Sequence, residues 1–125
     1  MATKPVVITY DPNNSSTPWS SSEQPVTVSP GTTTITWTIQ LASNNEGSIE
    51  FDDDPGSPGI KLTRHWPGQQ PTGDCDSWSV DAVDELQPGD KAKKYHYVVN
   101  AVYTAPGSST GERKKWDPDV EMDPP

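Results

Sequence analysis

Two histidines, one cysteine and a methionine form a set of side chains that could bind copper. They are His65, Cys75, His96 and Met122. Blue-copper sites use two His nitrogens and a Cys thiolate, with a weak axial Met. In such proteins the Cys, the second His and the Met share one short loop, whereas here one predicted strand separates Cys75 from His96 and Met122 lies beyond another. The spacing therefore argues against a copper site, and we expect no cofactor.

Nucleophilic catalysis would need the thiolate of Cys75, with His65 or His96 as its base. A reactive thiolate requires an electropositive setting. Asp74 and Asp76 instead flank Cys75, and their negative charges raise the pKa of a thiol. The sequence also contains no phosphate-binding loop, no zinc-ligand spacing and no Ser/His/Asp motif. We therefore predict that the protein is not an enzyme.

Acidic residues gather in two predicted turns. Asp52, Asp53 and Asp54 follow one short predicted strand, and Asp74 and Asp76 lie in a later loop. Hard oxygen donors on adjacent loops suit Ca²⁺, although EF-hand spacing is absent. Asp52, Asp54, Asp74 and Asp76 are therefore weak candidates for a calcium site. The alternative is that they are solvated carboxylates of ordinary turns.

Tryptophans in polar loops suggest a carbohydrate site. Trp19 and Trp66 lie among Ser, Asn, Gln and Asp residues. Flat indoles stack on sugar rings, while carboxylates and amides bind the hydroxyl groups, so Trp19, Trp66 and the run Asp52, Asp53 and Asp54 are the predicted ligand-binding residues. The polar loop around Trp19 also allows the alternative that this indole caps the hydrophobic core, which we favour.

The elements that must position these residues are β-strands. The stretch from Thr33 to Leu41 alternates Ile35, Trp37, Ile39 and Leu41 with threonines and a glutamine. Successive strand residues point to opposite faces, so one face is apolar and the other polar. We expect this stretch to be a central strand, with Trp37 as the largest side chain of the core.

Seven further segments have strand patterns. They are Val6–Tyr10, Pro25–Val28, Ser48–Phe51, Ile60–Thr63, Ser77–Ala82, Lys94–Thr104 and Asp119–Met122. In the longest of them Tyr95 and Tyr97 share one face, and we expect their rings to meet Trp37 inside. The sequence predicts an all-β fold: an antiparallel two-sheet β-sandwich, immunoglobulin-like in the broad sense, with seven or eight strands. Residues 1–125 form a single domain in this prediction, with tails at 1–4 and 123–125.

The charge and composition exclude several partners. The formal net charge is −9, from 18 acidic and 9 basic residues, so the chain should repel nucleic acid and anionic lipid. No apolar leader or membrane-spanning run is visible, and one cysteine permits no intramolecular disulfide. We expect a cytoplasmic protein that binds neither nucleic acid nor membranes.

The C-terminal third resembles a known family. An alternating aromatic strand that starts Tyr95-His96-Tyr97, a loop containing Gly111, and the ending Trp116-Asp117-Pro118-Asp119-Val120-Glu121-Met122 are similar to the end of the PixA/AidA inclusion-body proteins. The resemblance implies a bacterial, cytosolic, self-associating β-sandwich without a settled activity, and it brings no catalytic residues.

The residues of that ending also have a structural interpretation. Pro118 suits the entry to a strand because it has no N–H to pair. Asp117 can accept a backbone N–H in the turn, and Trp116 would close the end of the sandwich. A second resemblance is local: Leu86-Gln87-Pro88-Gly89 before Tyr95 and Tyr97 looks like the turn before the penultimate strand of fibronectin-III and immunoglobulin-like domains.

Together these observations predict a non-enzymatic interaction or assembly module, which binds a protein or self-associates through an exposed sheet edge. The alternative is a small lectin-like protein that binds carbohydrate, with calcium as a possible aid.

Overall fold

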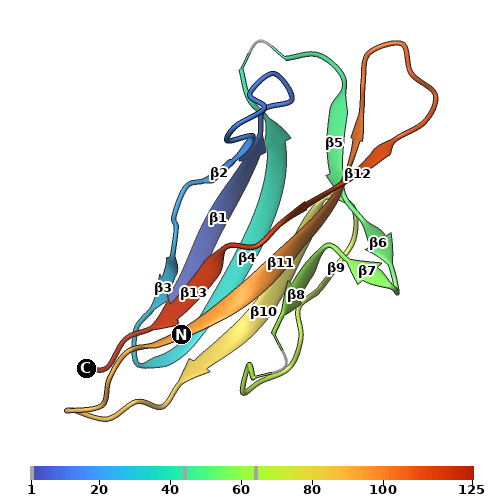
Figure 1. The fold of residues 1–125 in the computed structure, drawn as a ribbon. Coiled ribbons are helices and arrows are strands. Elements are labelled where there is room, and N and C mark those ends of the chain that lie inside the picture. Colours follow the sequence, from blue (N-terminus) through green and yellow to red (C-terminus); the bar gives the residue numbers. More distant parts are fainter. Residues whose placement is uncertain (1, 44, 64) are drawn as a thin grey trace.

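The chain folds into β-strands alone. A computed structural model describes residues 2–43, 45–63 and 65–125, and these ranges contain no helix. The strands are β1 (Ala2–Tyr10), β2 (Trp19–Ser21), β3 (Val26–Val28), β4 (Gly31–Leu41), β5 (Ser48–Phe51), β6 (Asp53–Asp54), β7 (Ser57–Pro58), β8 (Ile60–Leu62), β9 (Thr72–Gly73), β10 (Ser77–Asp84), β11 (Lys93–Thr104), β12 (Glu112–Trp116) and β13 (Asp119–Met122). Figure 1 shows their arrangement. The all-β prediction is confirmed.

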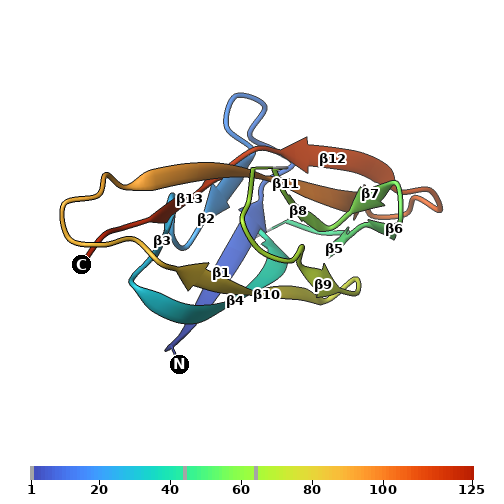
Figure 2. The same ribbon diagram turned by 90° about the horizontal axis from the view of Figure 1, so that it is seen from below.

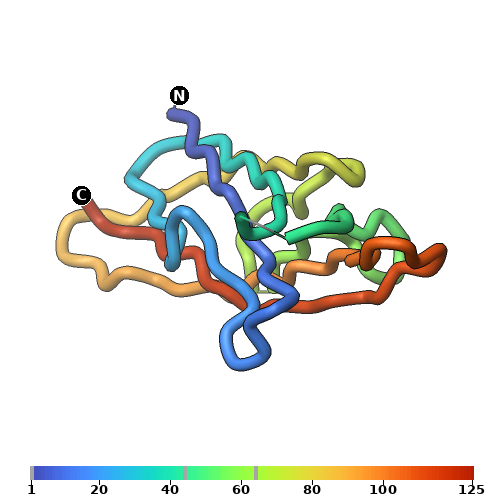
Figure 3. Tube along the Cα trace, turned by 90° about the horizontal axis from the view of Figure 1, so that it is seen from above, coloured from blue at the N-terminus to red at the C-terminus, as the bar shows by residue number. Residues whose placement is uncertain are grey.

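Two main sheets face each other. The first has the order β2-β1-β4-β10-β9, and the second has the order β12-β11-β13-β3, with β5 and β8 also paired to β11. Seen along the layers in Figure 2, β1, β4 and β10 lie in one layer, and β11, β12 and β13 lie in the other. Both ends of the chain lie on the same side of the molecule (Figure 3).

The predicted antiparallel character is wrong for two pairs of strands. β1 runs parallel to β4, with Ala2 opposite Thr33 and Tyr10 opposite Leu41, and β13 runs parallel to β3. Alternation of apolar and polar residues identifies a strand and its faces, but it carries no information about strand direction. Both main sheets are therefore mixed.

Thirteen strands occur in the described ranges, against the expected seven or eight. Each of the eight expected segments has a counterpart, and the additional strands are β2, β6, β7, β9 and β12. All five are short or lack apolar alternation, and they form strands because their backbones pair with neighbouring segments. Residues 2–4, expected in a tail, belong to β1.

Trp37 and Tyr97 meet in the core between the two sheets. Both side chains are completely buried, and their ring centroids lie 5.3 Å apart at an interplanar angle of 48°. Tilted aromatic pairs at this separation add to the stabilisation that burial of their area gives. Trp37 belongs to β4 and Tyr97 to β11, so this contact joins the centres of the two sheets. The predicted meeting of these two rings is confirmed.

A second aromatic group closes one end of the core. Tyr10 contacts Trp19 with ring centroids 4.7 Å apart and Tyr103 with centroids 5.5 Å apart. Trp19 in turn stacks on Trp116 with parallel rings 5.9 Å apart. Trp19 and Trp116 are half-buried against the core, and Trp116 has the closing position that the sequence predicted.

The residues after Trp116 lead the chain into β13. Pro118 is buried, and its carbonyl accepts a hydrogen bond of 2.9 Å from the Tyr97 N–H. Asp117 is exposed, and the predicted hydrogen bond to its side chain is not found among the described residues. Tyr95 is half-buried rather than fully inside, because it lies near the end of the sheet and meets the Trp66 ring edge-on at 5.2 Å.

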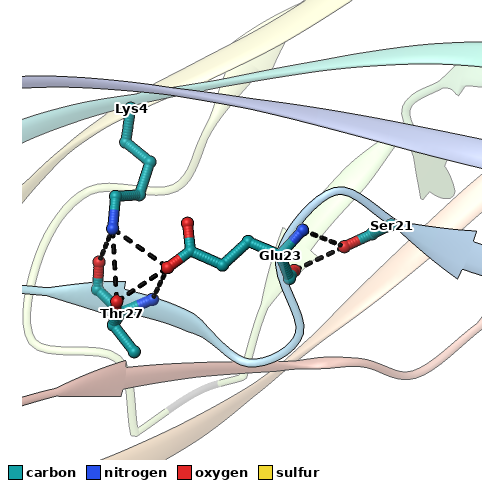
Figure 4. A network of polar contacts seen from close by, with 4 residues as sticks. All are labelled: Lys4, Ser21, Glu23 and Thr27. Atoms are coloured by element: carbon teal, nitrogen blue, oxygen red, sulfur yellow. Dashed lines mark hydrogen bonds and ion pairs between the residues drawn. The ribbon is translucent and has the colours of Figure 1, made fainter.

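A polar network joins the two sheets along one side (Figure 4). The Glu23 carboxylate accepts hydrogen bonds from Lys4 Nζ at 3.0 Å, from the Thr27 hydroxyl at 2.7 Å and from the Thr27 N–H at 3.1 Å. Lys4 Nζ also donates to the Thr27 carbonyl at 2.6 Å. Lys4 belongs to β1 and Thr27 to β3, so the network connects the margins of the two layers.

The network also shifts a pKa. Burial alone would raise the pKa of Glu23, but the hydrogen bonds from Thr27 and Lys4 and the charge of Lys4 outweigh it and lower this pKa. A carboxyl whose pKa is lower in the folded state than in the unfolded state stabilises the fold above its unfolded pKa. This stabilisation is lost as the pH falls through the folded pKa.

Glu23→Gln tests this network. We expect the substitution to lower the free energy of unfolding by about 1 kcal/mol at neutral pH, because it removes a charged acceptor of three hydrogen bonds. The difference from the wild type should shrink as the pH falls below the ordinary glutamate range. Urea denaturation at a series of pH values measures both effects. Glu46→Gln, at an exposed position, is the matched control, and an equal loss in both variants would contradict the assignment.

Candidate functional site

One edge of the first sheet is open. β9 pairs only with Trp78 and Ser79 of β10, so Val80–Asp84 have no neighbouring strand on that side within the described chain. The Asp74 N–H donates to the Ser77 carbonyl across this edge at 3.0 Å. In an antiparallel strand the backbone groups of every second residue point to the same side. The N–H and C=O groups of Asp81 and Val83 therefore point away from the sheet.

Two hollows follow this edge and share Gly68 and Val83 in their linings. Their volumes are about 470 Å³ and about 500 Å³. The first is lined by Trp66, Pro67, Gly68, Val83, Glu85, Leu86, Asp90, Lys93, Tyr95 and Met122. The second is lined by Gly68, Gln69, Gln70, Thr72, Ser79, Val80, Asp81 and Val83. We call the two hollows together with the open edge the β10 groove.

The far wall of the β10 groove is a loop held by its own hydrogen bonds. The Trp66 indole N–H donates to the Gln69 carbonyl at 3.1 Å. The Gln70 amide donates to the Leu62 carbonyl at 3.0 Å and accepts from the Leu62 N–H at 2.8 Å, as a neighbouring strand would. These bonds fix residues 66–70 beside β10 and keep the groove open.

Val83 is the most exposed large apolar side chain on the described surface. It is 46% exposed, whereas the apolar residues that precede it in β10, Trp78, Val80 and Ala82, are buried. The Val83 side chain points to the outer face of the sheet. The other side chains of β10 on that face are those of Ser77, Ser79 and Asp81. An exposed valine at an unpaired strand edge favours pairing with another strand.

Other strand edges are blunted. Pro5 lies on the outer edge of β1, where it presents no N–H, since Val7 two residues later accepts the Ser22 N–H on that side. β12 carries three basic residues, Arg113, Lys114 and Lys115, and lysine on an edge strand disfavours pairing. β3 has three residues only. The edge of β10 is therefore better suited to strand addition than the edges of β1, β12 and β3.

The predicted ligand-binding residues do not converge on one site. Trp66 is buried and lines the β10 groove. Trp19 lines a separate hollow of about 400 Å³, together with Tyr10, Asn14 and Lys115. Trp66 packs on Tyr95 and Trp19 on Tyr10, so the two tryptophans belong to different ends of the core.

Asp52, Asp53 and Asp54 lie in a third place. The Asp52 carboxylate is buried and accepts hydrogen bonds from the Asp54 N–H at 3.1 Å and from the Ser57 hydroxyl at 2.7 Å. Arg113 lies 3.6 Å from Asp52 and 3.3 Å from Asp54. Asp53 is exposed and belongs to β6, so it pairs in the small β6–β7 hairpin. The carboxylates of Asp52 and Asp54 therefore already have protein partners, whereas Asp53 is paired through its backbone.

The weak calcium candidates behave as turn residues. Asp74 Oδ1 accepts the N–H groups of Asp76 at 2.8 Å and of Ser77 at 3.2 Å. These backbone bonds lower the pKa of Asp74. The pKa of Asp54 is lowered by a hydrogen bond from the Gly56 N–H and by the charge of Arg113. Across the described ranges, no three His, Cys, Asp or Glu side chains are grouped so that they could hold a metal ion.

The residues considered for copper are also dispersed. His96 Nδ1 contacts Asp119 Oδ1. His65 is exposed in the loop after β8, and Met122 is buried in β13. Cys75 is half-buried beside β5, where its carbonyl accepts the Phe51 N–H at 3.0 Å.

Most residues of the β10 groove carry no recognisable signal in the sequence. Trp66 is among the predicted ligand-binding residues, whereas Val83 lies one residue beyond the predicted strand, which ends at Ala82. The available signal for Val83 is a valine at a polar position of an alternating strand. Leu86, in the turn that resembles those of fibronectin-III domains, is half-buried with one side in the groove.

No model of a known protein family matches the chain, and no curated protein matches it. In the described ranges, no helix is long and apolar enough to cross a membrane.

Cys75 provides a test of the local electrostatics. Burial raises the pKa of the Cys75 thiol, and the negative charges of Glu50, Asp76 and Asp74 raise it further. We expect the rate of labelling by a chromogenic disulfide reagent to be low at neutral pH and to rise only above the ordinary thiol pKa. Glu50→Gln should move this profile to lower pH, whereas Glu85→Gln, a distant control, should leave it in place. A profile centred below the ordinary thiol pKa would contradict the prediction.

Proposed function

We propose that the protein is a non-enzymatic interaction module that binds an extended polypeptide segment by strand addition at the β10 groove. The observation that carries the proposal is the open edge of β10, where the backbone groups of Asp81 and Val83 point outward beside a hollow with both apolar and charged lining residues. In strand addition the main-chain hydrogen bonds supply affinity, and pockets for alternate side chains supply specificity.

The dimensions of the groove support a single extended segment as the ligand. An added strand would lie roughly 4.8 Å from β10, in the space between β10 and the loop of residues 66–70. Every second side chain of that strand would face the hollow lined by Trp66, Leu86 and Tyr95, whose volume of about 470 Å³ accommodates a large apolar side chain. Lys93 faces Glu85 and Asp90 around the same hollow, so its rim carries both signs of charge.

The segment belongs either to another copy of this chain or to a different protein. The first case is an assembly module, in agreement with the resemblance of residues 95–122 to the self-associating PixA/AidA proteins.

The two facing sheets and the Trp37–Tyr97 contact support a β-sandwich, immunoglobulin-like in the broad sense, as the scaffold of the module. We further propose that the module works in the cytoplasm.

Val83→Pro tests strand addition with little risk to the fold. The Val83 N–H points to the open side, so proline removes a donor for the incoming strand and no hydrogen bond to β4. A displayed library of peptides is selected on the wild-type protein, and the affinities of enriched peptides are measured by calorimetry. We expect Val83→Pro to lower the affinities of these peptides by about tenfold or more. The incoming strand would lose at least one backbone hydrogen bond to β10, and with it the register that this bond fixes.

Val83→Thr is the matched control, because it keeps the N–H and a β-branched side chain. It should retain the affinity to within a few-fold. Light scattering at a series of protein concentrations gives the molar mass and so detects self-association. If the wild type forms oligomers and Val83→Pro does not, the bound segment belongs to a second copy of this chain. The proposal fails if enriched peptides bind Val83→Pro as well as the wild type, or if no peptide is enriched and the protein stays monomeric.

The hollow beside Trp19 favours carbohydrate binding as an alternative function. It brings the half-buried indole together with Asn14, Ser15 and Lys115, which supply an aromatic surface and polar groups for sugar hydroxyls. A glycan array probed with and without chelator tests this alternative. Because the acidic turns line other parts of the surface, we expect any binding to survive the chelator and to disappear in Trp19→Ala. Absence of binding in both conditions rejects the alternative.

A further inference from the structure

A basic hollow lies on the outer face of the second sheet. Its volume is about 580 Å³, and Lys61, His65 and Lys115 are among the residues that line it. Its apolar lining comes from Pro58, Leu62 and Val98. Val98 alternates with the buried Tyr97 and Val99 of β11, so this hollow faces away from the core. We call it the lysine hollow.

Strand register places the two lysines on opposite sides of β11. Lys61 of β8 is paired with Val98, and Lys115 of β12 is paired with Asn100 two residues further along β11. Paired residues of neighbouring strands point to the same face, so both side chains rise over the Val98 surface. Their backbones are two strand spacings apart, about 10 Å across β11. Each lysine stem is long enough for both ammonium groups to reach one ligand between them.

The lysines of this hollow lack acidic partners. Within the described residues neither Lys61 nor Lys115 forms an ion pair, whereas Lys4, Arg113 and Lys114 each do. No carboxylate is among the residues that line the hollow. In a chain with 18 acidic residues and 9 lysines and arginines, a hollow lined by two lysines and no acidic residue runs against the overall charge.

Two of the acidic residues next to the hollow are paired with Arg113. Ser57 belongs to the lining and donates to Asp52, but Asp52 is buried and lies 3.6 Å from Arg113. Asp54 is also paired with Arg113, at 3.3 Å. Arg113 therefore offsets part of the negative charge at this border, to which the exposed Asp53 beside Pro58 also contributes. The lining of the hollow itself carries lysines and no carboxylate.

We propose that the lysine hollow binds a small organic phosphate. The ammonium groups of Lys61 and Lys115 contact the phosphate oxygens, and the apolar part of the ligand lies on Pro58, Leu62 and Val98. Lysine binds phosphate as a compact point charge with several donors, whereas the planar fork of arginine suits carboxylates equally well. The volume lies within the range of small-molecule sites. A net charge of −9 disfavours a polyanion such as nucleic acid but not one phosphate group held between two lysines.

Calorimetric titration with phenyl phosphate tests this proposal on the full chain. The wild type should bind phenyl phosphate saturably and more tightly than inorganic phosphate, because the ring adds apolar contact, and it should not bind uncharged benzyl alcohol. The double variant Lys61→Gln/Lys115→Gln should bind phenyl phosphate at least about tenfold more weakly, since two charge-assisted contacts are lost. Amide chemical shifts of the wild type should move at Val98 and Asn100, which tests the location without any substitution.

Lys91→Gln/Lys94→Gln is the matched control, because it removes the same charge outside the hollow. It should keep the affinity of the wild type to within a few-fold. Equal weakening in both double variants would show general electrostatic attraction and overturn the proposal. Shifts confined to another surface, or no saturable binding up to about 10 mM, would also overturn it. None of these results depends on the β10 groove, so this inference and the proposed function fail or stand separately.

Discussion

The contact between Trp37 and Tyr97 is the constraint on which the rest of the structure depends. Each ring sits at the centre of its sheet and is completely buried, at a centroid separation of 5.3 Å. Successive strand residues face opposite sides, so fixing one inward residue fixes the orientation of its whole strand. With Trp37 inward, Ile35 must also face the core, and with Tyr97 inward, Val98 and Asn100 must face outward. The outer surface with the lysine hollow is therefore a consequence of the core register.

The two sides of the layered structure are closed in different ways, and this difference creates the β10 groove. On the side of β1, the Glu23 network connects Lys4 to Thr27 and joins the margins of both sheets. On the side of β10 the described residues contain no side-chain network of this kind, although the Phe51 N–H of β5 donates to the Cys75 carbonyl in the turn before β10. Trp66 instead packs edge-on against Tyr95 and covers the core from a loop. A loop that covers the core without pairing to the strand leaves backbone groups of that strand unpaired.

Much of the fold could be predicted from the sequence because alternation has a direct physical cause. The pattern of β4 and β11 reflects one buried and one exposed face, and burial follows it residue by residue. β12 could not be predicted in this way. Glu112–Trp116 has no apolar alternation, and it forms a strand because its backbone pairs with residues 99–103 of β11. Strand direction was likewise inaccessible, since the pattern of β1 is the same whether it runs parallel or antiparallel to β4.

The candidate sites were harder to predict than the strands because they join distant parts of the chain. Trp66, Val83 and Met122 line one groove, and no spacing in the sequence relates them. Lys61 and Lys115 are likewise brought together only by their separate registers with β11. A search for motifs finds chemistry that is local in sequence, such as the acidic run at Asp52. In the structure, Asp52 and Asp54 of this run accept hydrogen bonds within their own turn and lie next to Arg113. The backbone groups of the β10 edge and the two lysines, which have no such partners, lie elsewhere.

An open strand edge is a hazard as well as a binding surface, and the composition of the chain limits that hazard. Unpaired backbone groups beside an exposed valine promote edge-to-edge aggregation. The outward side chains along β10 before Val83 are serines and Asp81, and Glu85 follows, so another copy aligned on this edge would oppose like charges in several registers. The net charge of −9 adds a general repulsion between copies. These features disfavour indiscriminate pairing while leaving the Val83 backbone accessible. A segment added at this edge, as we propose, would therefore need side chains that match both the hollow and the mixed charges at its rim.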